Sequence, residues 1–201
     1  RPMADDTIAI CGLGTIGLLI LMFLLEKKKE KSQNTGRILV IGNKEFQKQT
    51  VLRMGISEDC YCDSKKEDVG KWLLDKTDGT GVNLFFECVG KNETLVQAVC
   101  GASPGGKVVL VGNPCSDMEL EKQVYWKILR NQLEIIGTWN SSFTKEAGDD
   151  WRYALERAER KRIAPGALIT HKFALDELKK GLHIMRDRTE DYIKIMSVVE
   201  G

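Results

Sequence analysis

Short β-rich runs and longer apolar stretches alternate along most of the chain. The first run, residues 7–11, ends directly in Gly12, and residues 15–25 are apolar on nearly every side. This pattern predicts a strand, a tight turn and a buried helix. We expect the helix to continue into the lysine-rich residues 26–36, because lysines near a helix C-terminus suit the helix dipole.

The same alternation continues to residue 136 and predicts further strands and helices. The strands are expected at residues 37–41, 59–62, 82–87, 107–111 and 133–136, and the helices at residues 45–54, 67–76, 92–100 and 121–131. Apolar residues on both sides of a strand are typical of a parallel sheet that helices cover on both faces. We therefore predict an α/β fold with a doubly wound parallel sheet of about six strands, a Rossmann fold.

The C-terminal part of the chain has a different pattern. A charged amphipathic helix is predicted at residues 149–161, and two β-rich runs, residues 168–173 and 192–199, flank a second helix at residues 175–186. Two strands and a helix outside the six-strand unit indicate a separate piece. We predict a nucleotide-binding domain at residues 1–138 and a distinct C-terminal segment at residues 139–201.

Composition and charge narrow the possible partners and the compartment. The chain has 201 residues, of which 30 are basic (Lys or Arg) and 29 acidic, so no strong net field attracts nucleic acid or a membrane surface. The apolar residues 16–25 are too few to span a bilayer. The six cysteines lie mostly inside apolar runs and lack the density of a secreted disulfide scaffold. We expect reduced thiols and a cytoplasmic protein.

The segment GLGTIG, residues 12–17, carries the first chemical signal. It follows a predicted strand and opens a predicted helix, so Gly12 can form the turn, Gly14 can let the backbone approach a pyrophosphate, and Gly17 can let helix and strand pack closely. The N–H groups of Thr15 and Ile16 would then face the phosphates. A glycine turn needed only for packing, and the glycine turn of a methyltransferase that uses adenosylmethionine, are the competing interpretations.

Several segments together resemble one family. GLGTIGLL, NLFFECVG, SPGGKVVLVGNP and KILRNQLEIIGTW stand in the order found in the medium-chain, zinc-type alcohol and polyol dehydrogenases. The resemblance covers nearly the whole chain, and residues 127–140 are most similar to the sugar-alcohol branch, which includes galactitol-1-phosphate and sorbitol dehydrogenases. It implies that the parent protein oxidises a secondary alcohol by hydride transfer to a nicotinamide, while zinc polarises the substrate oxygen.

The resemblance also implies a nicotinamide dinucleotide as the cofactor and assigns its contacts. The pyrophosphate contacts would be Gly12, Gly14, Thr15, Ile16, Gly17 and Lys194; the adenosine-side contacts would be Cys88, Val89 and Gly90; and the nicotinamide contacts would be Val111, Gly112, Asn113, Gly137 and Thr138. Without the resemblance, Lys194 would be about as well explained as an exposed strand lysine.

The residues after the second predicted strand bear on the choice between NADP and NAD. An acid is expected there, about 20 residues after the glycine turn, to bind the ribose hydroxyls. This chain has Gly42, Asn43 and Lys44 instead, after a longer spacing. Gly42 would remove the charge that repels a 2′-phosphate, and Lys44 would supply a cation, as in family members that use NADP. We predict NADP, with NAD as the alternative and with a solvent-exposed Lys44 as the other interpretation.

The family binds its catalytic zinc in an N-terminal domain, which this sequence does not match. The chain has only two histidines, His171 and His183, and the pair Cys60 and Cys62 is poorly spaced for a metal. We predict no metal site and no catalytic residue in this chain, and zinc only in the full-length parent. The resemblance implies that residues 139–201 pack on that N-terminal domain.

Two further expectations concern assembly and role. In the family the last strand of the sheet, here Leu133 to Ile136, often pairs with its twofold mate, so we expect a homodimer. A non-catalytic module that senses a nucleotide is the alternative function. The nicotinamide contacts that the resemblance assigns to residues 111–113 and 137–138 favour the dehydrogenase, because a sensor of adenosine alone would not need them.

Overall fold

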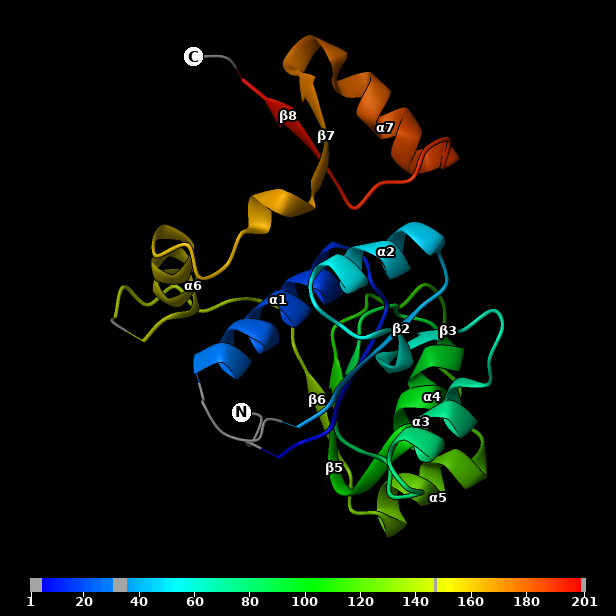
Figure 1. Ribbon diagram of the computed structural model, residues 1–201. Coiled ribbons are helices and arrows are strands. Elements are labelled where there is room, and N and C mark those ends of the chain that lie inside the picture. The colour runs from blue at the N-terminus through cyan, green and yellow to red at the C-terminus, as the bar shows by residue number, and fades with distance from the viewer. Residues whose placement is uncertain (1–4, 31–35, 147, 200–201) are drawn as a thin grey trace. The chain divides into compact units, whose positions relative to one another are not determined.

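The structure is a computed structural model that describes residues 5–30, 36–146 and 148–199 (Figure 1). The chain divides into two compact units, Arg1–Ser141 and Ser142–Gly201.

The first unit is built on one six-stranded sheet. Its strands are β1 (Ile8–Cys11), β2 (Ile38–Gly42), β3 (Tyr61–Asp63), β4 (Val82–Glu87), β5 (Ala102–Leu110) and β6 (Glu134–Gly137). They lie in the order β3-β2-β1-β4-β5-β6, and every neighbouring pair is parallel. The order reverses between β1 and β4, which is the switch point of a doubly wound sheet.

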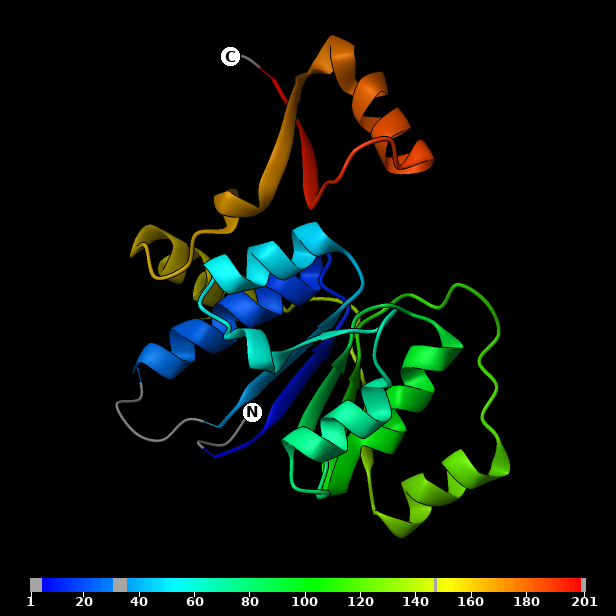
Figure 2. The ribbon, with the colours of Figure 1, turned by 45° about the vertical axis from the view of Figure 1, so that its right-hand side comes forward.

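Helices cover both faces of this sheet. They are α1 (Thr15–Glu30), α2 (Glu45–Arg53), α3 (Val69–Lys76), α4 (Asn92–Gly101) and α5 (Lys122–Arg130). Helices α1 and α2 lie on one face, and α3, α4 and α5 lie on the other (Figures 1 and 2). The predicted α/β fold, a doubly wound parallel sheet in the Rossmann arrangement, is confirmed.

The core lies on both sides of the central strands. Every residue of β1 and β2 is buried, and the side chains of Ile10, Leu39 and Phe85 have no exposed surface. Burying a side chain of this size stabilises the fold by about 1.5–3 kcal/mol. Helix α1 packs Leu18, Leu21 and Leu24 into this core. Because helices cover both faces of the sheet, the central strands are continuous apolar runs and do not alternate between apolar and polar residues.

Several predicted boundaries differ from the structure by one to five residues, and two of them have a clear structural reason. Strand β5 begins at Ala102, five residues before the predicted start at Lys107, because Ser103 to Gly106 continue the strand next to an irregularity between Val82 and Leu84. Strand β3 is Tyr61–Asp63, since Glu58–Cys60 form a short 3₁₀ turn in place of the predicted strand start. The predicted continuation of α1 into residues 26–36 is confirmed as far as Glu30, and residues 31–35 lie outside the described residues.

The second unit contains helix α6 (Asp150–Glu159), strand β7 (Ile169–Ala174), helix α7 (Leu178–Asp187) and strand β8 (Lys194–Val198). Asp149 caps α6 because its side chain accepts a hydrogen bond of 2.7 Å from the backbone N–H of Arg152. Strands β7 and β8 are parallel. Gly181 of α7 packs against Phe173 and Ile195, so the helix covers one face of this small sheet.

Candidate functional site

The strand register brings the carboxyl ends of the central strands to one edge of the sheet. Cys11 at the end of β1 lies opposite Ile41 in β2 and opposite Glu87 in β4. Glu87 lies opposite Leu110 in β5, which lies opposite Gly137 in β6. The predicted cofactor contacts of the first unit lie at these strand ends, in the loops that follow them or in the first turn of α1. We call this edge the strand-end edge.

The glycine turn has the geometry that its spacing predicts. Gly12 has a φ of +99°, which a residue with a side chain rarely adopts. A Cβ at Gly17 would lie 1.9 Å from the carbonyl oxygen of Gly12, so α1 and β1 pack closely only because residue 17 is glycine. A Cβ at Gly14 would meet no atom within 4 Å. The N-terminus of α1, which begins at Thr15, therefore borders open space beside Gly14.

That open space fits a phosphate group. The first N–H groups of a helix carry a partial positive charge and lack carbonyl acceptors within the helix, so a helix N-terminus favours an anion. A side chain at residue 14 would fill the space that a pyrophosphate needs. Thr15 and Ile16 form the first positions of α1, and the side chain of Ile16 is exposed.

The turn after β4 is held by the buried carboxylate of Glu87, which the sequence reasoning did not identify. Its Oε1 accepts hydrogen bonds from the backbone N–H groups of Val89 (2.8 Å) and Gly90 (2.9 Å). It also accepts one from the hydroxyl of Thr94 (2.8 Å). The side chain of Glu87 is buried among apolar strands, where a carboxylate is stable only when donors satisfy it.

Close backbone contacts join this turn to its neighbours. A Cβ at Gly12 would lie 2.7 Å from Cγ2 of Val89. A Cβ at Gly90, which has a φ of +79°, would lie 1.9 Å from the carbonyl oxygen of Asn113, and a Cβ at Gly112 would lie 2.2 Å from the backbone nitrogen of Gly90. Glycine at these three positions therefore lets the loops after β1, β4 and β5 meet.

The loops after β5 and β6 continue the strand-end edge. The backbone N–H groups of Val111 and Gly112 both donate to the carbonyl oxygen of Glu87, each at 2.8 Å. The N–H of Thr138 donates to the carbonyl oxygen of Leu110 at 3.2 Å. A Cβ at Gly137 would meet no atom within 4 Å. The structure thus brings residues 111–113 next to the turn after β4 and residues 137–138 next to the end of β5.

Residues 42–44 at the end of β2 include no acid where a ribose carboxylate is usual, and the acid that lies opposite Gly42 is Asp63 of β3. A Cβ at Gly42 would point at Cδ1 of Leu13 (2.9 Å), Oε1 of Gln47 (3.2 Å) and Cε2 of Tyr61 (3.3 Å). The Oε1 of Gln47 also accepts a hydrogen bond of 3.4 Å from the N–H of Asn43. A neutral amide from α2 therefore borders Gly42, which sequence reasoning missed because Gln47 was read only as a helix residue.

The two predicted cations have separate surroundings. Lys44 precedes α2, and its Nζ lies 5.2 Å from the centroid of the Phe46 ring. Lys194 is an exposed residue of β8 in the second unit, where it lies opposite Ile169. The contact predicted between Lys194 and the pyrophosphate stays a prediction.

The cysteines at this edge are neutral thiols. Burial and, to a smaller extent, the nearby carboxylate of Glu87 together raise the pKa of Cys11 to about 12. Burial likewise raises the pKa of Cys88 to about 12. A thiol with so high a pKa is a poor nucleophile and a poor metal ligand near neutral pH. Among the described residues, no group of three or more His, Cys, Asp or Glu side chains is placed to hold a metal ion.

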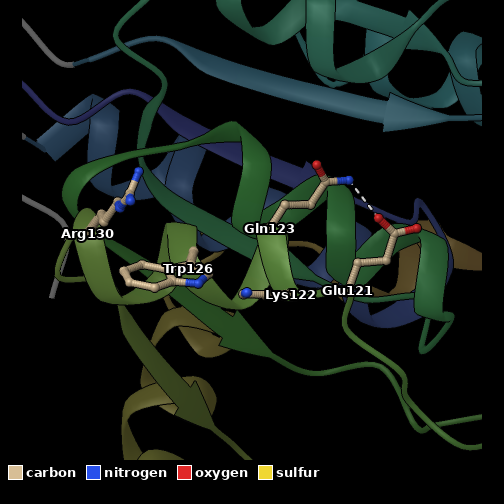
Figure 3. Close-up of a pocket in the computed structure, with 5 residues that line it drawn as sticks. All are labelled: Glu121, Lys122, Gln123, Trp126 and Arg130. Atoms are coloured by element: carbon tan, nitrogen blue, oxygen red, sulfur yellow. Dashed lines mark hydrogen bonds between the residues drawn. The ribbon is translucent and has the colours of Figure 1, made fainter.

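A surface hollow of about 580 Å³ lies away from the strand-end edge, along α5 (Figure 3). It is lined by Glu121, Lys122, Gln123, Trp126 and Arg130. The guanidinium of Arg130 lies 4.6 Å from the centroid of the Trp126 ring, and Gln123 donates a hydrogen bond of 2.6 Å to Glu121. Four of the five lining side chains thus interact in pairs, and none of the five residues is a predicted cofactor contact. No helix among the described residues is long and apolar enough to cross a membrane.

Comparison with known proteins identifies the family. The model of the zinc-binding dehydrogenase family matches residues 31–160, which is more than half of the chain. The chain therefore belongs to the zinc-binding dehydrogenase family. The matched segment begins after the glycine turn and includes β2 to β6, so the turn itself is an observation independent of that match.

Curated relatives agree with this assignment. The chain is 25% identical to L-threonine 3-dehydrogenase of Bacillus subtilis over 184 residues, covering 91% of this chain and 49% of the relative. It is 23% identical to sorbitol dehydrogenase of Halalkalibacterium halodurans, covering 90% of this chain and 49% of the relative. The chain thus spans about half the length of the relatives it matches.

Solved structures show the same fold. Galactitol-1-phosphate dehydrogenase from Escherichia coli superposes with a TM-score of 0.78 at 21% identity, covering 94% of this chain and 54% of that one. A zinc-binding dehydrogenase from Sinorhizobium meliloti bound to NADP gives 0.77 at 23% identity, covering 97% and 53%. A short chain alcohol dehydrogenase from Escherichia coli in complex with NADH gives 0.77 at 20% identity, covering 100% and 53%.

Proposed function

We propose that the first unit binds a nicotinamide dinucleotide and is the cofactor-binding part of an alcohol or polyol dehydrogenase. The observation that carries this proposal is the strand-end edge, where a glycine turn with open space beside Gly14 meets the N-terminus of α1. Solved structures with the same fold contain NADP or NADH. Dinucleotides bind at the carboxyl ends of the strands of such sheets, at the point where the strand order reverses.

Different residues of the strand-end edge would contact different parts of the cofactor. Thr15 and Ile16 would present backbone N–H groups to the pyrophosphate, with Gly12, Gly14 and Gly17 leaving room for it. The loop of residues 88–90 would line the adenosine side, and residues 111–113 and 137–138 would orient the nicotinamide ring. Lys194 of the second unit would reach the pyrophosphate. The bound nicotinamide would supply hydride transfer, while this chain binds and orients it.

The end of β2 supports NADP over NAD as the cofactor. Residues 42–44 supply no carboxylate that would repel a 2′-phosphate, and Lys44 supplies a cation at the start of α2. Both NADP and NADH occur in structures of the same fold, so the choice rests on these residues alone.

The activity of the whole protein is also part of the proposal. Relatives twice as long as this chain are named for the oxidation of threonine or sorbitol, and we assign to the full-length protein the zinc-assisted oxidation of a secondary alcohol. Two exposed isoleucines of the edge strand β6, Ile135 and Ile136, support a homodimer that pairs this strand with its mate. All six cysteines are free thiols, which supports a cytoplasmic protein.

Calorimetric titration of the chain with NADPH and with NADH tests the proposal. We expect both to bind and NADPH to bind more tightly, with the preference reduced in Lys44→Ala because the variant loses the cation. Gly14→Ala is the control for the site: its Cβ meets no protein atom, so the fold is kept while the phosphate is blocked. Binding of neither dinucleotide, or equal binding by Gly14→Ala, contradicts the proposal. Tighter binding of NADH contradicts the choice of NADP alone.

A further inference from the structure

The turn after β4 is the point where the loops of the strand-end edge meet. It touches the glycine turn through Gly12 and Val89, and it touches the loop after β5 through Gly90 and Asn113. A shift of this turn would therefore displace the loops after β1 and β5 as well. Whatever fixes the turn also fixes the relative positions of the three loops.

Glu87 fixes the turn through hydrogen bonds that both its side chain and its backbone carbonyl accept. The carboxylate of Glu87 accepts from the N–H groups of Val89 and Gly90 and from the hydroxyl of Thr94. Its backbone carbonyl accepts from the N–H groups of Val111 and Gly112. Glu87 thus bonds to the loop after its own strand and to the loop after the neighbouring strand.

Thr94 links this network to the start of α4. Its hydroxyl oxygen accepts a hydrogen bond of 3.2 Å from the N–H of Lys91, the residue before α4. Its single proton has two acceptors in reach, Oε1 of Glu87 at 2.8 Å and the carbonyl oxygen of Lys91 at 2.9 Å. The carboxylate therefore receives one donor from a helix and two from the turn. A single oxygen with three donors at 2.8–2.9 Å leaves the turn little freedom.

We propose that Glu87 is a positioning residue for the dinucleotide: its buried carboxylate holds the loops after β4 and β5 in the arrangement that binds the cofactor. This inference rests on the proposed function, because it concerns the same site. Glu87 does not touch the cofactor in this account. It acts through the backbone of residues 88–90 and 111–113, which are the predicted contacts.

Four variants separate positioning from a general loss of stability. Glu87→Leu removes the acceptor, Glu87→Gln keeps an acceptor oxygen in the same place, and Thr94→Val removes one of the three donors. Thr77→Val is the matched control at the opposite end of β4: this buried hydroxyl donates to Leu73 at 2.7 Å and accepts from Gly81 at 2.9 Å, and it has no bond to the strand-end edge.

The measurement is the dissociation constant for NADPH and for NADH at a temperature where every variant is folded, together with amide hydrogen exchange at Val89 and Gly90. We expect Glu87→Leu to weaken binding by about tenfold or more, because a displaced loop misplaces several contacts at once. Exchange at the two amides should accelerate, since they lose their acceptor. Thr94→Val should fall between wild type and Glu87→Leu. Glu87→Gln should recover most of the affinity, and Thr77→Val should stay within about threefold of wild type.

Each outcome bears on one proposal or on both. If the wild-type chain binds neither dinucleotide, the proposed function fails and the role of Glu87 fails with it. If the wild type binds and Glu87→Leu loses no more affinity than Thr77→Val, the role of Glu87 fails and the proposed function stands. If Glu87→Gln is as weak as Glu87→Leu, a hydrogen-bond acceptor at this position is not what holds the loops, and the inference is overturned.

Discussion

The two parallel sheets of this chain differ in how many of their faces are covered. In the six-stranded sheet every residue of β1 and β2 is buried, and helices cover both faces. In the two-stranded sheet, half-buried and exposed residues alternate along β7 and β8. A strand that is covered on both faces is therefore buried at every residue, whereas a strand that is covered on one face alternates between buried and exposed residues. The first sheet is covered on both faces at its central strands and is exposed along its edge strand β6, whereas the second sheet has one face that its own unit leaves exposed.

The largest expected difference concerns a central aromatic residue. Phe85 of β4 is fully buried, whereas Phe173 of β7 is half-buried. Phe85→Ala should lower the free energy of unfolding of the first unit by about 3–5 kcal/mol, because it leaves a cavity among side chains that cannot collapse. Phe173→Ala should cost the second unit clearly less. Chemical denaturation followed by NMR signals of each unit measures both, and equal losses would contradict the comparison.

A second pair of variants probes helix packing in each unit. Gly17→Ala places a Cβ 1.9 Å from a backbone oxygen, so the free energy of unfolding should fall by about 1–3 kcal/mol or more. Gly181→Ala on α7 meets side-chain atoms instead, Ile195 at 2.9 Å and Phe173 at 3.2 Å, which can move. Both variants gain helix propensity, about 1 kcal/mol for glycine to alanine. Thermal unfolding should therefore show a loss for the first variant and little change for the second.

A third pair keeps side-chain shape and changes polarity only. Val108 in β5 is 0% exposed, and Val198 in β8 is 43% exposed. Val108→Thr buries a hydroxyl and should cost about 1–3 kcal/mol unless that hydroxyl finds an acceptor. Val198→Thr keeps its hydroxyl in water and should change stability by less than about 0.5 kcal/mol. Urea midpoints that shift equally would show that β8 is covered on both faces.

A last difference is a dependence on alkaline pH that belongs to the first unit, which contains all six cysteines. Burial raises the pKa values of Cys11, Cys62 and Cys88 from 9.0 to about 12. Each thiol contributes its full stability below pH 9 and loses it as the pH rises from 9 to 12, because only the unfolded chain then releases the proton. The slope is at most about 1.4 kcal/mol per pH unit for each thiol.

Denaturation at pH 8 and at pH 10 measures this effect, with Cys11→Ala as the comparison. The variant should lose less stability between the two pH values than the wild type does. A wild-type stability that is constant or rises over this interval would contradict the assignment of buried, neutral thiols.

Much of this fold could be predicted from sequence, because long apolar runs and glycine positions carry local information. The predicted strand 82–87 matches β4 at both ends, and GLGTIG identified the turn that leads into α1. The start of β5 could not be predicted, since Pro104, Gly105 and Gly106 are typical of a turn. Their place in the strand depends on pairing with β4, which is a long-range contact.

The sequence predicted the glycines of the candidate site, but it did not predict the polar side chains that hold its loops in place. Glu87 stood in the quoted segment NLFFECVG, but its role depends on donors that only the folded loops supply, namely residues 89, 90 and 94. Gln47 was missed because only the structure shows that its amide reaches Asn43 beside Gly42. Sequence patterns indicate where the backbone turns, but they do not indicate which side chain forms hydrogen bonds to the backbone of a loop.

The most direct test of the central claim is to map dinucleotide binding onto the first unit by NMR. Amide signals of an isotope-labelled chain are followed as NADPH, or NADH in a parallel sample, is added. The account predicts that the largest shifts fall on residues 12–17, 88–90 and 111–113, while Tyr125 and Trp126 of α5 stay unchanged. Shifts confined to α5, or none on the glycine turn at saturating dinucleotide, would contradict a cofactor site at the strand-end edge.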